Sequence, residues 1–183
     1  MDFAEMAKQR KLDANRFYLM ISGDKEFTSD EYISVLKDGS IVTMQHSELV
    51  AYLADKLLSS QIEQGREIRI VTGDNIGIDQ IATTYSIVND YERVVVKTDW
   101  DKNGSQAGYR KNETLYYKVC NKQNKGVLLF WNGVNQFTLH LIYLAYEFGL
   151  NIKVYNYKTK KWLTKETIEM LQRNEADRQS RYK

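Results

Sequence analysis

The sequence predicts a single α/β domain built on a parallel β-sheet, and three observations support this class. First, five short apolar runs recur along the chain, each followed by turn residues. Second, stretches with helical periodicity separate these runs. Third, 43% of the 183 residues are hydrophobic and 27% are charged, an ordinary balance for one globular domain. Alternating strands and helices are typical of parallel sheets with right-handed crossovers.

Short apolar runs such as these, bounded by turn residues, are typical of buried strands in a parallel sheet. They cover 17–21, 68–71, 94–96, 127–130 and 152–155. The segment 40–45 fits either an extra strand or a loop. Thr28 and Glu31 fit a capping box that would begin a short helix.

Helices are expected between the strands. Leu49, Leu53 and Leu57 recur every four residues and therefore share one helical face. The other predicted helices cover 78–88, 108–120, 138–148 and 164–181.

The two ends of the chain differ from its centre. Residues 1–15 form a polar arm or short helix, 16–157 carry the strand–helix pattern, and 158–183 form a helical tail. Thr164 is suited to cap the tail helix, whose apolar face is thin. That helix is either solvated or packs on a second subunit.

Composition argues against several classes of function. The net charge is +2, so no overall positive field favours nucleic acid or an anionic membrane. The single cysteine, Cys120, excludes an intramolecular disulfide, and His46 and His140 lack the partners of a metal site. No apolar run reaches the ~20 residues of a membrane helix, and the start is unlike a signal peptide. We therefore expect a cytoplasmic protein with no membrane partner, metal or cofactor.

Glycine-containing turns follow three of the predicted strands and lead into helices. They contain Gly23, the pair Gly73 and Gly77, and Gly133. In an open α/β sheet, ligands bind at the carboxyl ends of the strands. Glycine lets the backbone approach a phosphate, and free N–H groups at a helix start attract its charge. These turns therefore predict a phosphate-binding crevice.

Side chains near these turns complete the predicted site. Arg110 offers a planar fork suited to phosphate, and Asn112 can contact backbone, base or ribose. Trp131 can either stack on a base or cover the sheet edge. Phe137 either packs into the core beside Leu141 or forms an apolar wall with Trp131.

Together these motifs resemble the SLOG superfamily of Rossmann-like nucleotide-binding domains, in the YspA-like branch related to the DNA-processing protein DprA and the LOG hydrolases. The matching segments are 22–30, 73–79, 99–100, 107–112 and 130–138. The resemblance implies a five-stranded parallel sheet of order 3-2-1-4-5 with helices on both faces, terminal helices and a homo-oligomer. It also implies the following ligand-binding set: Gly23, Asp24, Lys25, Gly73, Asn75, Gly77, Asp79, Arg110, Asn112, Trp131, Asn132, Gly133 and Thr138.

The chain departs from the family's pattern at several positions. Asp24 and Lys25 stand where Ser and Arg are usual, and Phe137 stands where a glycine is expected. The Pro-Gly-Gly signature of the LOG hydrolases is absent, which weakens the case for glycosidic-bond hydrolysis.

Three functions remain open. The first is binding or sensing of a nucleotide-derived ligand, such as an ADP-ribose-like or cyclic signal, including its sequestration in bacterial or phage defence. The second is hydrolysis of a glycosidic or phosphoribosyl bond, with Glu113 or Asp79 as the catalytic carboxylate and Arg110 on the phosphate. The third is single-stranded DNA handling as in DprA, which the low net charge disfavours.

Overall fold

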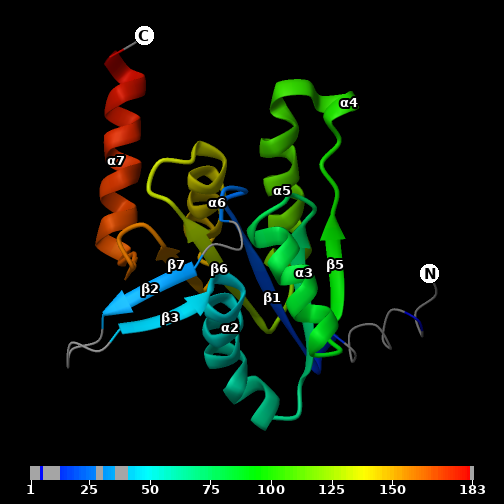
Figure 1. The fold of residues 1–183 in the computed structure, drawn as a ribbon. Helices are drawn as coiled ribbons and strands as arrows, with labels where there is room; N and C mark the ends of the chain where they lie inside the picture. The colour runs from blue at the N-terminus through cyan, green and yellow to red at the C-terminus, as the bar shows by residue number, and fades with distance from the viewer. Residues whose placement is uncertain (1–4, 6–12, 28–30, 36–40, 182–183) are drawn as a thin grey trace.

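The computed structural model describes residues 5, 13–27, 31–35 and 41–181 (Figure 1). Its main sheet has six strands in the order β5-β4-β1-β6-β7-β8. Their bounds are β1 Arg16–Gly23, β4 Glu67–Gly73, β5 Glu92–Val96, β6 Lys125–Trp131, β7 Ile152–Asn156 and β8 Lys161–Trp162. The first five of these strands in chain order pair in parallel, in the order that the resemblance implied.

The expectation of a five-stranded, wholly parallel sheet is corrected by β8. This strand pairs antiparallel with β7, through Tyr155 with Trp162 and Asn156 with Lys161. It is two residues long and follows a turn in which Lys160 has a φ of 58°. Such a short edge strand has no apolar run, so the hydrophobic pattern could not predict it.

A separate two-stranded sheet replaces the short helix expected after Thr28. β2 (Glu31–Val35) pairs antiparallel with β3 (Ile41–Gln45). The extra strand considered for 40–45 therefore exists over 41–45, while residues 28–30, including the proposed cap, lie outside the described residues. The helix prediction was wrong because a capping-box pattern is local, and strand pairing overrides it.

Six described α-helices connect or flank the strands: α2 His46–Glu63, α3 Ile78–Val88, α4 Trp100–Asn103, α5 Ala107–Cys120, α6 Gln136–Glu147 and α7 Lys165–Arg181. The predicted helices in the centre of the chain are thus present within a few residues of their expected bounds. Thr164 caps α7 as predicted, because its hydroxyl accepts a hydrogen bond from the Thr167 N–H at 3.3 Å. Among the described residues, no helix is long and apolar enough to cross a bilayer.

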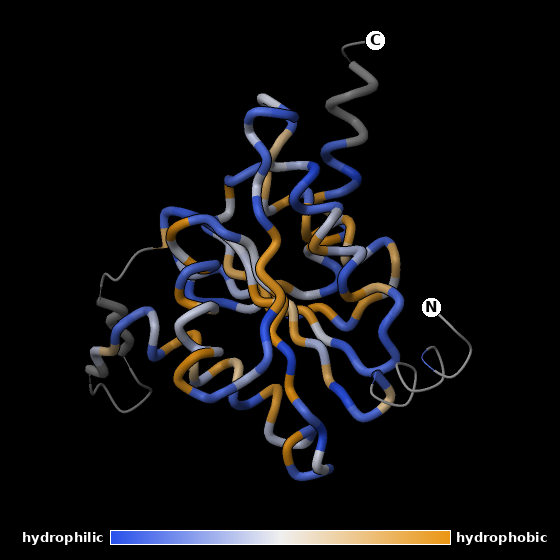
Figure 2. Tube along the Cα trace, turned by 90° about the vertical axis from the view of Figure 1, so that its right-hand side faces the viewer, coloured by the Kyte–Doolittle hydropathy of each residue, from blue (hydrophilic) through white to orange (hydrophobic). Residues whose placement is uncertain are grey.

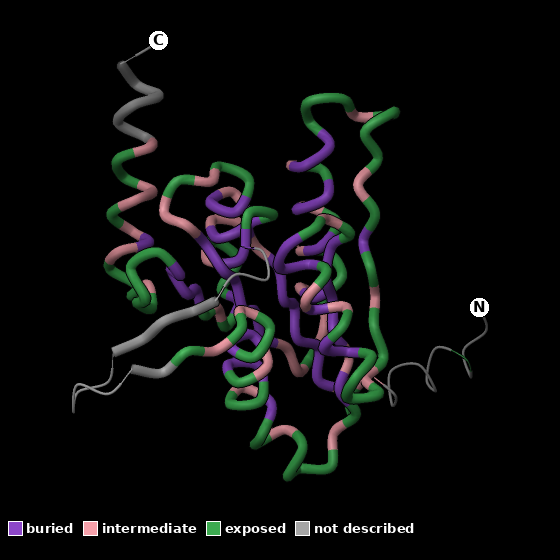
Figure 3. The backbone as a smooth tube through the Cα atoms, in the orientation of Figure 1, coloured by how far each residue is buried: buried purple, intermediate pink, exposed green. Residues whose placement is uncertain are grey.

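Two hydrophobic layers enclose the sheet, one on each face. Phe17, Leu19 and Ile21 of β1 point to the layer formed with α2 and α3. The intervening Tyr18 and Met20 point to the layer formed with α5, α6 and the start of α7. Figure 2 shows the hydrophobic segments gathered along the sheet, and Figure 3 shows them buried. Burial on both faces explains why β1 is apolar without alternation. This arrangement is consistent with a Rossmann-like α/β fold.

Candidate functional site

A crevice of about 100 Å³ opens at the carboxyl ends of the central strands, beside the starts of α5 and α6. Here β4 and β6 lie on opposite sides of β1, so the chain winds in opposite directions from this point. Such a switch point is where open α/β sheets bind ligands. The crevice is lined by Ser22, Gly23, Lys25, Asn75, Trp100, Gly108, Lys111, Asn112, Asn135, Phe137, Thr138 and Leu141.

A buried ion pair underlies the crevice. The Lys111 ammonium lies 3.0 Å from Asp79 Oδ2, and the two side chains are 5% and 0% exposed. The Ser22 hydroxyl donates to Asp79 Oδ1 at 2.6 Å, and the Asn75 N–H donates to Oδ2 at 3.3 Å. A buried pair is favourable only when its remaining hydrogen-bonding capacity is also satisfied. Asp79 meets this condition, because Ser22 and Asn75 both donate to its carboxylate.

Among the described residues that line the crevice, Lys111 is one of two that are cationic. Its ammonium has three donors, and one of them is used by Asp79. Lys25 is exposed and lines the same crevice, whereas none of the described residues lining it is Asp or Glu. The crevice therefore favours an anionic group.

Two of the predicted glycines serve packing beneath the crevice. A β-carbon on Gly73 would lie 2.2 Å from Asp79 Oδ2 and 2.9 Å from Lys111 Nζ. Gly77 has a φ of +80°, and a β-carbon there would lie 2.6 Å from the Lys25 carbonyl oxygen. Gly73 thus gives the ion pair its space, and Gly77 lets α3 begin against the loop after β1.

Asp24 joins distant segments and does not line the crevice. Its carboxylate accepts hydrogen bonds from Thr138 Oγ1 at 2.5 Å, Tyr157 OH at 3.0 Å and the Asn132 N–H at 2.6 Å. Burial raises the pKa of Asp24, and these hydrogen bonds offset only part of that rise. Burial and the neighbouring Asp24 also raise the pKa of Tyr157. Asp24 therefore links the segments that carry Asn132, Thr138 and Tyr157 from a buried position.

Arg110 and Glu113 lie outside the crevice. Arg110 is 63% exposed, and its guanidinium pairs with Glu113 at 2.8 Å on the surface of α5. Lys111 instead shares the buried face of α5 with Leu115 and Val119. The spacing of four residues between these three positions was the signal in the sequence that could have selected Lys111 over Arg110.

The turn after β6 is organised by its own hydrogen bonds. Trp131 is buried, and its Nε1–H donates to the Asn135 carbonyl at 3.0 Å. The Asn132 side chain accepts from the N–H groups of Val134 and Asn135, both at 2.8 Å. Gly133 has a φ of +94°, which suits glycine at this turn. These three predicted residues therefore shape the turn and do not line the crevice.

Two aromatic residues line the crevice instead of Trp131. Phe137 is 41% exposed and Trp100 is 55% exposed. Sequence reasoning paired Phe137 with Trp131, but β6 directs Trp131 into the layer shared with α5 and α6. Trp100 belongs to α4, which follows β5. The five members of the predicted set that line the crevice are Gly23, Lys25, Asn75, Asn112 and Thr138.

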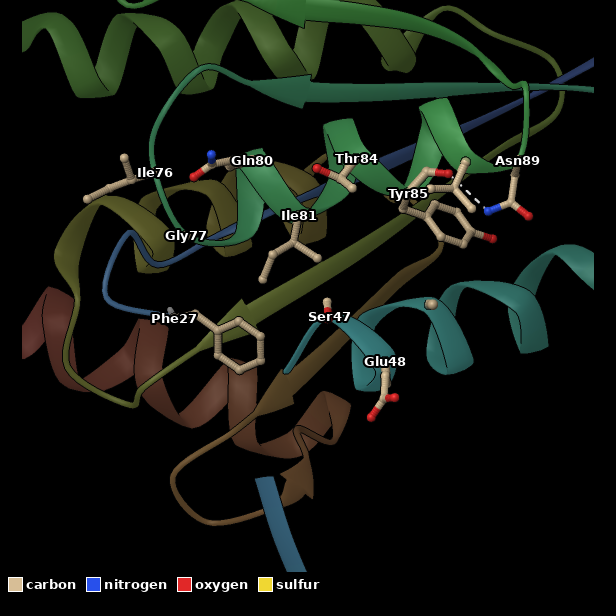
Figure 4. Close-up of a pocket in the computed structure, with 12 residues that line it drawn as sticks. Phe27, Ser47, Glu48, Ile76, Gly77, Gln80, Ile81, Thr84, Tyr85 and Asn89 are labelled. Carbon is tan, nitrogen blue, oxygen red and sulfur yellow. Dashed lines mark hydrogen bonds between the residues drawn. The ribbon is translucent and has the colours of Figure 1, made fainter. Parts of the chain in front are cut away.

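A second hollow lies between α2 and α3, with a volume of about 670 Å³ (Figure 4). Phe27, Ile81 and Tyr85 point toward it, and none of the described residues lining it is Lys or Arg. The groove shares none of its described lining residues with the crevice. Its apolar lining makes it a poor match for a phosphate.

Comparisons of the chain with protein-family models, curated proteins and solved structures found no match. The fold and the crevice together define an α/β protein with an open, mostly parallel sheet and an anion-compatible site at its carboxyl edge. Membership of the SLOG superfamily, a cytoplasmic location and a homo-oligomeric state stay predictions.

Proposed function

We propose that this protein binds a nucleotide or nucleotide-derived ligand, with a phosphate of the ligand seated in the crevice against Lys111. The observation that carries this proposal is the buried Lys111 ammonium, held by Asp79 at the wall of a switch-point crevice. A charge-assisted hydrogen bond to phosphate is stronger than a neutral one, and it is strengthened further where water is excluded.

Binding is better supported than hydrolysis. A hydrolase of glycosidic bonds needs a carboxylate that reaches the ribose. Asp79 is enclosed by its hydrogen-bond partners, and Glu113 pairs with Arg110 on the exposed face of α5. A binding role suits a sensor of an ADP-ribose-like or cyclic signal, or a protein that sequesters one in bacterial or phage defence.

The proposal is tested by thermal unfolding with adenosine 5′-monophosphate, ADP-ribose and cyclic nucleotides. A ligand at 100 times its Kd stabilises the folded state by about 2.7 kcal/mol. We expect at least one of these compounds to raise the Tm of the wild-type protein. No stabilisation by any of them would contradict the proposal.

The matched variants are Lys111→Met combined with Asp79→Asn, and Arg110→Ala. The double variant removes both buried charges together, so it avoids leaving Asp79 unpaired. We expect it to lose at least tenfold in affinity for the stabilising compound, whereas Arg110→Ala keeps wild-type affinity. If Arg110→Ala lost affinity and the double variant kept it, the phosphate would be assigned to Arg110 instead.

A further inference from the structure

Phe137 is held firmly at the mouth of the crevice although it is partly exposed. A β-carbon on Gly108 would lie 2.7 Å from both Cδ1 and Cε1 of Phe137, so the ring rests on the α5 backbone. The Asn112 amide donates to the Phe137 carbonyl at 2.6 Å, and the Tyr109 ring centroid is 4.8 Å away. The ring is therefore fixed without being covered.

Trp100 reaches the same crevice from a different element. It begins α4, and Asp99 caps that turn by accepting a hydrogen bond from the Lys102 N–H at 2.9 Å. Trp100 and Phe137 thus bring two exposed aromatic side chains, from α4 and α6, to one opening. Exposed aromatic rings beside a cationic group are suited to a ligand that carries both a planar ring and an anion.

The size of the crevice sets which part of a ligand enters it. Its volume of about 100 Å³ is well below the roughly 300–1,000 Å³ of sites that enclose a whole small molecule. Only the anionic end of a nucleotide fits beside Lys111, so the rest of the ligand must lie over the mouth, where Trp100 and Phe137 are exposed.

We propose that Trp100 and Phe137 are specificity-determining residues that hold the planar base of the ligand, so that the site selects a base-bearing phosphate ester over a sugar phosphate. This inference rests on the proposed function. It adds that affinity comes from the rings as well as from the phosphate, since stacking on one aromatic side chain contributes roughly tenfold in affinity.

The test compares two probes by titration calorimetry: adenosine 5′-monophosphate and ribose 5-phosphate, which lacks the base. We expect the wild-type protein to bind the first at least tenfold more tightly. Trp100→Leu and Phe137→Leu should each lose roughly tenfold in affinity for adenosine 5′-monophosphate and keep the wild-type affinity for ribose 5-phosphate. Trp100→Phe should retain most of the wild-type preference, because it keeps an aromatic face.

Phe148→Leu is the matched control, because Phe148 is an exposed phenylalanine at the other end of α6. It should leave both affinities unchanged. Tryptophan fluorescence gives a second measurement: adenosine 5′-monophosphate should quench the emission of the wild-type protein, and much less that of Trp100→Phe. The remaining tryptophans, Trp131 and Trp162, do not line the crevice.

The outcomes separate the two proposals. Equal affinity of the wild-type protein for both probes would overturn the aromatic selection and leave phosphate binding intact. An equal loss of affinity for both probes in the leucine variants would also overturn the aromatic selection, because such a loss would show an effect on the whole site. Binding of neither probe would overturn the aromatic selection for adenosine 5′-monophosphate, whereas the proposed function would fall only if ADP-ribose and the cyclic nucleotides also gave no stabilisation.

Discussion

The ring of Phe137 occupies the space that a side chain at Gly108 would fill, with two ring carbons 2.7 Å from the position of the missing β-carbon. This contact joins α5 to α6 at the mouth of the crevice. In a helix, alanine is ordinarily the better residue by about 0.5–1 kcal/mol. The presence of glycine at position 108 is explained by the ring above it.

The effect of Gly108→Ala on the free energy of unfolding is therefore expected to change sign when Phe137 is replaced. In the wild-type background it should lower the free energy of unfolding by about 1–3 kcal/mol, the usual cost of overpacking. In a Phe137→Ala background it should raise that free energy by roughly 0.5 kcal/mol, because only the helix propensity remains. Urea unfolding of the four proteins measures both effects. The same sign in both backgrounds would show that the ring does not constrain position 108.

Substitutions of Lys111 and Asp79 should have strongly coupled effects on the free energy of unfolding. Lys111→Met leaves a buried carboxylate without its cation, and we expect a loss of about 3–5 kcal/mol in the free energy of unfolding. Adding Asp79→Asn should recover most of this loss, because the remaining side chain is neutral. Chemical unfolding of the two single variants and the double variant gives the coupling energy. Additive effects would contradict a direct pair.

Much of the fold was predictable because its central strands β1, β4 and β6 are largely buried and therefore form apolar runs. The prediction of Arg110 as a crevice residue differs from the structure, in which Lys111 lines the crevice and Arg110 does not. Which face of α5 meets the sheet depends on tertiary packing, and the guanidinium was preferred for its chemistry before that face was known. Trp131 lies in the layer shared with α5 and α6 because side chains alternate between the two faces along β6, which places it with Val127 and Leu129.

Asp24 and Asp74 should affect the pH dependence of stability in opposite directions. Burial raises the folded-state pKa of Asp24, so the folded protein binds more protons than the unfolded chain as this group titrates. Its contribution to stability therefore falls as the pH rises above ~3.9, the ordinary pKa of aspartate. Asp24→Asn should reduce this fall, as measured by the free energy of unfolding between about pH 3 and 7. An unchanged profile would contradict the raised pKa.

Asp74 is the matched comparison. Partial burial alone would raise its pKa, but hydrogen bonds from the Thr98 N–H and hydroxyl outweigh that effect and the net shift is downward. Its stabilising contribution is present above the unfolded pKa and is lost as the pH falls through the folded pKa. Asp74→Asn should therefore reduce the acid sensitivity of the protein, in the same unfolding series. Greater acid sensitivity in this variant would contradict the assignment.

Asn135 should stabilise the start of α6. Its side chain accepts from the N–H groups of Phe137 and Thr138 at 3.0 and 3.1 Å, as an N-cap residue does. Asn135→Ala should lower the free energy of unfolding by about 1 kcal/mol, and Asn135→Asp should keep most of the stability. Thermal unfolding of the two variants checks this, and equal losses would assign Asn135 a role other than capping.

The hydrogen bonds of Asp24 also bear on the order in which the chain folds. Its partners are 108, 114 and 133 residues further along the sequence. They come from the turn after β6, from α6 and from the segment after β7, so all three must dock before the carboxylate is satisfied. Contacts of such long range close late, after the loop entropy between them has been lost. We therefore expect Asp24→Asn to accelerate unfolding and to leave the refolding rate nearly unchanged in stopped-flow measurements.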